Sequence, residues 1–359
     1  RSSVCFCNAA SAPGTDRMRD RLSYGIFDQL ESDGTTPISD SYRNHLALAE
    51  RADEAGFTHW FKSEHHHVPL DIAPSINVFL SAVIQRTERI RVASLVHLLP
   101  FYDPMRLYEE LCMLDHLSEG RLEIGFGKGV SPAEQMLWGV PRDEALARTE
   151  ESLDYVLSAM ALTANEGLGC LFSYDGQYWS STERPLEIGP YQKPHPPLWR
   201  PGTLSTAAQL GASTILPGPI SIIPGQIHAY REEASENGAG GHTPLLSTLR
   251  RVVVAPTDEE AAAIGARAWQ QFDSNLTKLM RKYDLWPPNL VPSFLGDVKM
   301  ANDTESLIAG SPGRVREYFD KFREESGLQH VTISPAWGDI SGDEALRTMD
   351  LFVEHVVDG

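Results

Sequence analysis

The sequence predicts an α/β fold, a (β/α)8 TIM barrel with an insertion after the seventh strand. Eight short apolar runs alternate with helix-like stretches along residues 22–359. Residues 90–99 are almost continuously apolar, which is typical of a strand buried on both faces of a parallel sheet. The first strand is not followed by the G-x-G-x-x-G turn that an open, doubly wound sheet usually carries. Eight parallel strands with outer helices therefore favour a closed barrel.

The strands and helices are predicted from hydrophobic periodicity and from residues that end helices. The predicted strands are 22–27, 57–61, 90–99, 121–125, 197–200, 213–216, 249–254 and 330–334. The predicted helices are 39–55, 76–86, 104–119, 146–160, 205–210, 226–236, 258–283 and 345–356. Pro104 suits a first helical turn, and Gly56 and Gly120 are placed to end two of the helices.

Three segments fall outside this repeat. The aromatic residues around Asp175 and Gly176 predict a small hairpin within 171–188. Residues 285–309 lack periodicity and contain Trp286-Pro287-Pro288, so we expect a loop in the insertion that covers the barrel mouth. Residues 1–21 are predicted to be a disordered tail, which leaves one domain over 22–359.

Composition excludes several classes of protein. The 359 residues contain 31 Lys or Arg and 49 Asp or Glu, a formal net charge of −18. This charge repels nucleic acid and anionic membranes, so neither is an expected partner. No apolar run reaches the ~18 residues of a membrane span. Four cysteines in so long a chain do not make a disulfide framework, and we predict a cytoplasmic protein.

The most polar strand end follows the second predicted strand. Glu64, His65 and His66 lie there, and barrel active sites lie at the carboxyl ends of strands. One interpretation is a solvated, His-rich loop. A second is a metal site that uses Glu64 and His66, which point to one side of an extended chain, with help from His97. A third is an organic cofactor over the barrel mouth, with one imidazole as an acid, base or hydrogen-bond donor.

Two further strand ends could bind an anion. After the fourth strand, alternating glycines allow close backbone approach to a ligand, and Lys128 supplies a local cation that the acidic surface lacks. Gly202 and Thr203 precede a helix, whose first N–H groups are free to bind an anion. A plain turn with a solvated lysine, and ordinary helix capping, are the alternatives.

Several of these motifs occur together in the order seen in one family. The chain resembles the bacterial luciferase-like flavin-dependent monooxygenases, part of the superfamily of luciferases and F420-dependent oxidoreductases, over about residues 22–350. The matching residues are Ser63-Glu64-His65-His66, Asp103-Pro104-Met105-Arg106 with Glu109, the run from Leu114 to Gly125 with Gly127-Lys128-Gly129, Tyr174-Asp175-Gly176, Pro194-His195-Pro196-Pro197 and Gly310-Ser311-Pro312-Gly313.

The resemblance implies an enzyme with a (β/α)8 barrel and, usually, a homodimer. It implies reduced FMN, supplied by a separate flavin reductase, that reacts with O2 as a C4a-peroxyflavin. The substrate would be a small organic molecule such as an aldehyde, ketone or sulfonate. The alternatives are an F420-dependent oxidoreductase that transfers hydride, a non-catalytic flavin-binding barrel, and metal-dependent hydrolysis. We favour FMN, because the C-terminal half shows no extra basic cluster for the anionic tail of F420.

The resemblance also assigns roles to residues. His65 matches the family's catalytic histidine, with Glu64 and His66 beside it, and no metal ligand is implied. Lys128 stands where the family has a phosphate-binding arginine, next to Gly129 and Val130 in the cofactor site.

The remaining cofactor residues come from two other strand ends. Leu95 and Val96 fall where the family often has a non-prolyl cis peptide under the flavin, and His97 follows them. Gly202 and Thr203 lie where other members place a second phosphate-binding pair.

Overall fold

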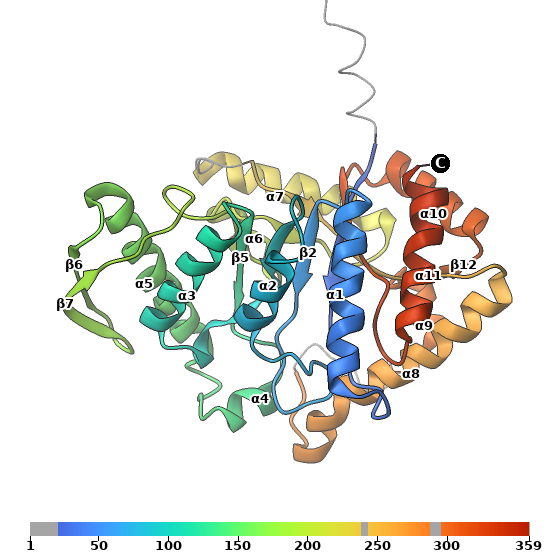
Figure 1. Ribbon diagram of the computed structural model, residues 1–359, viewed down its shortest axis with the longest axis horizontal. Helices are drawn as coiled ribbons and strands as arrows, with labels where there is room; N and C mark the ends of the chain where they lie inside the picture. Colours follow the sequence, from blue (N-terminus) through green and yellow to red (C-terminus); the bar gives the residue numbers. More distant parts are fainter. Residues whose placement is uncertain (1–20, 238–242, 288–295, 359) are drawn as a thin grey trace, which may run out of the picture.

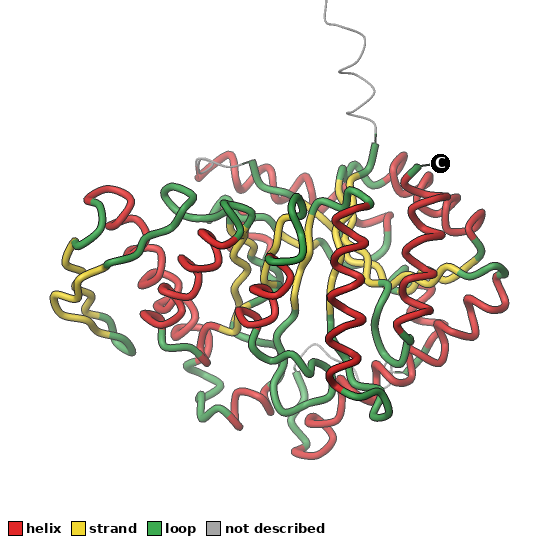
Figure 2. The backbone as a smooth tube through the Cα atoms, viewed as in Figure 1, coloured by secondary structure: helices red, strands yellow, loops and turns green. Residues whose placement is uncertain are grey.

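The central feature of the fold is a set of parallel strands with helices packed around them (Figures 1 and 2), and the strand pairing forms a ring. The computed structural model describes residues 21–237, 243–287 and 296–358. The strands of the ring are β1 (Ser23–Asp28), β2 (His59–Lys62), β3 (Arg91–Ser94), β5 (Leu122–Gly127), β8 (Leu198–Trp199), β9 (Thr214–Ile215), β10 (Leu246–Ser247) with β11 (Leu249–Val254), and β13 (His330–Ser334). They match the eight predicted strands in order.

Strand pairing runs round the whole ring. From β1 through β2, β3 and β5 to β8, each strand pairs in parallel with the next. A parallel bridge from Trp199 to Ser213 leads to β9, which pairs with β10. Leu249 at the start of β11 then pairs with Thr332 of β13, and β13 pairs with β1. The predicted barrel is therefore confirmed.

The helices cover the outside of the ring (Figure 1). They are α1 (Ile38–Glu54), α2 (Ile76–Ile84), α3 (Pro104–Leu117), α4 (Pro132–Leu137), α5 (Ala145–Glu166), α6 (Leu204–Gln209), α7 (Ile223–Asn237), α8 (Asp258–Tyr283), α9 (Val298–Asp303), α10 (Pro312–Glu325) and α11 (Gly342–Phe352). Shorter helical turns are η1 (Leu99–Phe101), η2 (Ile220–Ile222) and η4 (Val353–Val357). No helix in the described ranges is long and apolar enough to cross a membrane.

Local sequence explains where the main helices begin and end. Asp103 caps α3 by accepting from the N–H of Arg106, and Pro104 fills the first turn. Gly120 has φ +83° just after α3, a conformation that favours glycine. In α8 the first turn is acidic and the last turn basic, as the helix dipole prefers. These signals are local, which is why sequence analysis could find these helices.

The strands bury side chains on both faces. Ile26, Trp60 and Val92 face the helices and belong to the main core. Phe61 and Trp199 fill the inside of the ring, where their ring centroids lie 4.7 Å apart at 78°. Burial on both faces accounts for the apolar runs that predicted a parallel sheet.

The third predicted strand is interrupted, so the prediction of one strand over 90–99 is wrong. The chain turns at a cis peptide bond between Leu95 and Val96, then resumes as β4 (His97–Leu98) beside β5. A Cβ on Gly125 would lie 2.0 Å from the carbonyl oxygen of Ser94, so glycine is required there. The apolar run hid this turn, because its cause lies on the neighbouring strand.

The three segments outside the repeat have different outcomes. The predicted hairpin is confirmed as β6 (Cys170–Asp175) and β7 (Ser180–Leu186), which project from one side of the barrel (Figure 1). In contrast, 285–309 is not a structureless loop, because it contains α9 and the start of β12 (Leu307–Gly310), which pairs with β11. Residues 288–295 of the predicted lid, and 1–20 of the predicted tail, lie outside the described residues.

Candidate active site at the carboxyl ends of the strands

The chain after β2 brings a buried carboxylate and an imidazole together. Oε1 of Glu64 lies 2.8 Å from Nε2 of His66. Oε2 accepts from the hydroxyl of Tyr102 at 2.8 Å and from the backbone N–H of Leu98 at 3.2 Å. Burial raises the pKa of Glu64 above its usual range, although the hydrogen bonds from His66 and Tyr102 oppose this. Glu64 therefore ties β2 to β4 and orients His66.

His65 has a separate carboxylate partner. Its Nδ1 lies 3.3 Å from Oε1 of Glu134 on α4, and the same oxygen accepts from the backbone N–H of His66 at 2.9 Å. Burial alone would lower the pKa of His65, but the hydrogen bond and charge of Glu134, with the charge of Asp71, raise it above its ordinary value. Glu134 thus holds the ring and favours the imidazolium.

The base of this strand end is a buried ion pair. The ammonium of Lys62, which is fully buried, bonds to Asp71, and Oγ of Ser63 donates to the same carboxylate. A backbone N–H, that of Ala73, also donates to Asp71 at 2.8 Å. Nζ of Lys62 also donates to the carbonyl of Ser63 at 3.1 Å, so the pair holds the backbone just before Glu64.

The turn at Leu95 and Val96 packs tightly against β5. Oγ of Ser94 accepts from the N–H of Gly125 and donates to its carbonyl, both at 2.8 Å. A Cβ on Gly127 would lie 2.9 Å from Cγ2 of Val96. Both glycines are therefore needed for contact with the turn, whereas sequence analysis interpreted them as room for a ligand. The cis peptide that the resemblance implied is present.

His97 lies behind the strands, between the barrel and the helix α2. It is fully buried, and its Nε2 lies 2.7 Å from Oδ1 of Asn77 on α2, so the ring points towards the helices. Burial lowers its pKa to about 4. The structure therefore does not bring His97 together with Glu64 and His66 as ligands. Over the ranges that the structure describes, no three His, Cys, Asp or Glu side chains are placed to hold a metal ion.

Exposed groups occupy the ends of β5 and β8. Lys128 is exposed, and within the described residues its ammonium has no ion-pair partner. Gly129 has φ +80°, and Val130 is 64% exposed. Gly202, with φ +106°, and Thr203 are exposed in the loop before α6. Since β5 and β8 pair in parallel, both loops leave the same end of the barrel.

Sequence analysis missed three residues of this site. Glu134, Tyr102 and Asp71 each bond to a residue of the segment 62–66. Only Ser131-Pro132 carried a local signal, because Ser131 caps α4, with its Oγ 3.3 Å from the N–H of Glu134. The other contacts join distant parts of the chain, so spacing does not reveal them.

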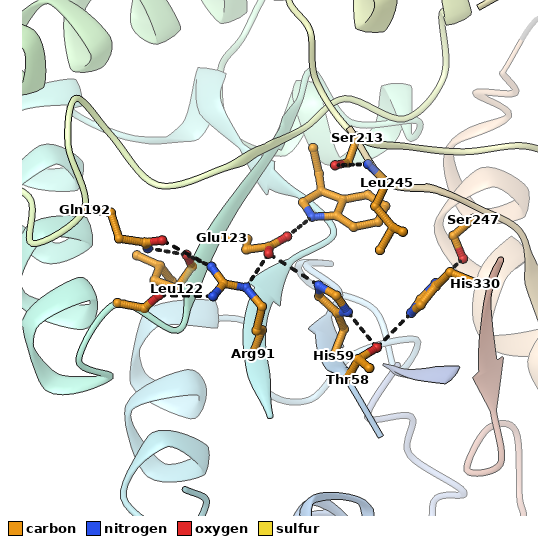
Figure 3. A network of polar contacts seen from close by, with 12 residues as sticks. Thr58, His59, Arg91, Leu122, Glu123, Gln192, Ser213, Leu245, Ser247 and His330 are labelled. Atoms are coloured by element: carbon orange, nitrogen blue, oxygen red, sulfur yellow. Dashed lines mark hydrogen bonds and ion pairs between the residues drawn. The ribbon is translucent and has the colours of Figure 1, made fainter. Parts of the chain in front are cut away.

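A second polar network fills the amino-terminal end of the barrel (Figure 3). Glu123 bonds to Arg91 and Trp199, and lies 3.3 Å from Nε2 of His59. Burial alone would raise its pKa, but His59, Arg91 and Trp199 hold the pKa of Glu123 down to about 2. Sequence analysis assigned no role to Glu123. The network lies at the opposite end from His65 and Lys128.

Known proteins share this sequence and fold. The uncharacterized protein y4wF of Sinorhizobium fredii is 35% identical over 94% of this chain and 97% of its own length. The monooxygenase RslO1 of Streptomyces bottropensis superposes with a TM-score of 0.80 at 25% identity, over 94% of this chain and 99% of its own.

A second solved structure shares the fold. The oxygenating constituent of 3,6-diketocamphane monooxygenase of Pseudomonas putida, in complex with FMN, has a TM-score of 0.76 at 20% identity, over 94% of this chain and 98% of its own. The model of the luciferase-like monooxygenase family matches residues 22–330. The strand order and the family match agree: the chain belongs to the luciferase-like monooxygenase family.

Proposed function

We propose that the protein is a monooxygenase that uses reduced FMN, delivered by a separate flavin reductase, and O2. One oxygen atom would enter a small organic substrate such as an aldehyde, ketone or sulfonate. The other would leave as water, with the two electrons and two protons of reduced FMN consumed. The observation that carries this proposal is the pairing of His65 with Glu134 at the end of β2, in a barrel of this family.

The residues at the barrel mouth fit a phosphorylated flavin. Lys128 offers a cation with no ion pair among the described residues, and it leaves the barrel at the same end as Gly202 and Thr203. Lys128, with Gly202 and Thr203, would hold the phosphate. Leu95 and Val96, which keep partial exposure, would lie against the ring system. Bound reduced FMN would supply the electrons that activate O2.

His65 would handle the proton. Its Nδ1 faces Glu134, which leaves Nε2 without a hydrogen-bond partner in the described part of the chain. The raised pKa keeps the imidazolium populated to a higher pH than in an ordinary histidine, so Nε2 can donate a proton at the reacting centre. Glu64 would position His66 beside it.

The test compares the two candidate cofactors. The purified protein is titrated anaerobically with reduced FMN and with reduced F420, and oxygen uptake is then followed with aldehydes, cyclic ketones and alkanesulfonates. We expect FMN to bind more tightly and oxygen uptake to yield an oxygenated product. Tighter binding of F420, with hydride transfer and no oxygen uptake, would contradict this proposal.

The homodimer stays a prediction, which analytical ultracentrifugation would test.

A further inference from the structure

Arg251 holds an unusual position at the barrel mouth. It pairs with Ser334, the last residue of β13, and so lies level with the carboxyl ends of the strands. Its Nη2 donates to Oε1 of Gln29, just after β1, at 3.1 Å. Three aromatic rings surround the guanidinium: its carbon lies 3.8 Å from the ring centroid of Phe272, 5.6 Å from that of Trp337 and 5.8 Å from that of Trp269.

This cluster has donors without acceptors. Nε of Arg251 and the indole N–H groups of Trp269 and Trp337 are buried and have no hydrogen-bond partner among the described residues. No carboxylate in the described ranges lies within ion-pair distance of Arg251. A buried N–H without an acceptor is costly. The guanidinium has Gln29 and three aromatic rings around it but no carboxylate at ion-pair distance among the described residues, so a ligand with negatively charged oxygen acceptors would satisfy the three free N–H groups.

The neighbouring arginine, Arg250, does not lack hydrogen-bond acceptors. Arg250 points to the other side of β11, and its guanidinium donates to Tyr318, Thr248 and the carbonyl of Gly218 at 2.8 Å each. The two adjacent arginines thus differ at Nε, which donates to Tyr318 in Arg250 and has no partner among the described residues in Arg251. Arg250 is a structural residue, whereas Arg251 has unused donors at the end of the barrel where ligands bind.

The nearest acidic group does not neutralise Arg251. Glu31, after β1, accepts from Nδ2 of Asn275 at 2.8 Å. Burial raises the pKa of Glu31 to about 7, against the hydrogen bond from Asn275 and the charges of Arg251 and His65. Glu31 and Arg251 each favour the charged form of the other, but the two side chains form no ion pair. Glu31 follows β1 and His65 follows β2, and these two strands pair in parallel, so both residues lie in the same part of the mouth.

The position of Arg251 differs from that of the proposed phosphate cation. Lys128 follows β5, and β8 and β9 separate β5 from β10 and β11 round the ring. One phosphate held at Lys128 does not account for free donors at β11. An anion bound at Arg251 would therefore belong to another ligand.

We propose that Arg251, with the indole N–H groups of Trp269 and Trp337, binds the carboxylate of an organic substrate. This inference rests on the proposed function, because it names the substrate class of the same mouth. The aromatic walls suit an apolar body next to the anion. The substrate is then an organic anion rather than a neutral aldehyde or ketone.

Benzoate is the probe, and neutral benzamide, which has the same ring, is its control. Both are titrated calorimetrically into the full-length protein, with and without FMN, while tryptophan fluorescence reports on Trp269 and Trp337. We expect benzoate to bind and benzamide to bind much more weakly. Arg251→Gln should lower benzoate affinity by about tenfold or more, as expected for lost hydrogen bonds to a charged group, and Arg251→Lys by less. Circular dichroism checks that each variant is folded.

Arg281→Gln is the matched control. Arg281 lies near the end of the same helix as Phe272, stacks over Trp286 at 6.0 Å and is more than half exposed. The substitution Arg281→Gln removes the same charge as Arg251→Gln. We expect its benzoate affinity to stay within about twofold of that of the parent. Absence of benzoate binding, equal binding of benzamide, or equal losses in both arginine variants overturns the proposal.

Two further measurements separate this inference from its alternatives. If Arg251→Gln weakens FMN much more than riboflavin, Arg251 serves the flavin phosphate and the proposal fails. If benzoate binds through Arg251 but no substrate drives oxygen uptake, the anion site stands and the monooxygenase proposal fails. Oxygenation of neutral ketones that is unaffected by Arg251→Gln leaves the monooxygenase standing and overturns the anion site.

Discussion

The two ends of the barrel both contain buried charged groups, but they differ in how those groups are paired. At the amino-terminal end, Glu123 meets Arg91, His59 and the indole of Trp199, so its carboxylate is well supplied with donors (Figure 3). At the carboxyl end, Lys128 has no ion pair among the described residues, and Nε of Arg251 has no hydrogen-bond partner there. The first arrangement is complete within the chain, and the second needs a ligand.

The pKa directions follow the same division. Surrounding donors hold the pKa of Glu123 down to about 2, against burial, whereas burial raises the pKa of Glu64. A satisfied carboxylate stabilises the fold in its charged form. A carboxylate whose pKa is raised by burial, as in Glu64, contributes less stability in its charged form, a cost that proteins accept at sites that bind or react. The comparison predicts that mutations at the amino-terminal end change stability and that mutations at the mouth change chemistry.

The largest expected effect is on stability, from Glu123→Gln. The change leaves Arg91 and His59 facing a neutral amide, and we expect the free energy of unfolding to fall by about 3 kcal/mol. Urea denaturation measures this value. Glu109→Gln is the control, because Glu109 is exposed and its carboxylate makes a long contact, 3.9 Å, with Arg106. This variant should lose less than ~1 kcal/mol of unfolding free energy. A loss of turnover per folded molecule in Glu123→Gln would break the division between the two ends.

The same variant has a pH signature. The pKa of Glu123 is lower in the folded chain than its ordinary value of 4.5, so its stabilisation is present above pH 4.5 and is lost as the pH falls from 4.5 towards 2. The stability difference between parent and Glu123→Gln should therefore be constant near neutral pH and shrink in that acid window. A difference that stays constant down to the lowest accessible pH would contradict the pairing.

At the mouth, His65→Ala should lower turnover by ~10²-fold or more, within the range of acid–base groups, because no other group replaces the proton at Nε2. FMN affinity should change little. His67→Asn is the control, since His67 has φ +60°, which asparagine tolerates, and lies outside the proposed proton path. Near-parental turnover of His65→Ala would remove His65 from the mechanism.

Lys128→Ala should weaken FMN binding by about 1.5–3 kcal/mol, the scale of hydrogen bonds to a charged group. Riboflavin, which lacks the phosphate, should lose much less affinity. Fluorescence titration measures both, and Lys321→Ala, on the exposed face of α10, serves as the control. Equal losses for the two flavins would show that Lys128 does not contact the phosphate.

The smallest effect is a pH shift from Glu134→Gln. Glu134 raises the pKa of His65 against burial, so its removal should lower that pKa, measured by NMR titration of the imidazole. The alkaline fall in turnover should move to lower pH by the same interval. If the His65 titration moves and the activity profile does not, the imidazolium is not the reacting form.

How far sequence analysis could go depends on the distance over which each contact acts. The helix α8 was predicted with its observed bounds, because its cap and its charged turns are local. The strand over 90–99 was predicted too long, because the turn at Leu95 depends on Gly125 of the next strand. Glu64, His65 and His66 were found as a run of neighbours, whereas Glu134, on a different element, was not.

The sequence by itself determined the order of the eight barrel strands, the family and the cluster after β2, since periodicity and short motifs act between residues near in the chain. It did not predict the helices α4, α9 and α10. The tertiary structure alone decided which groups are paired. It turned His97 towards Asn77, placed Glu134 against His65 and left Arg251 with unused donors. Hydrogen bonds and burial depend on distances of a few ångströms between elements far apart in sequence, and only the closed barrel sets those distances.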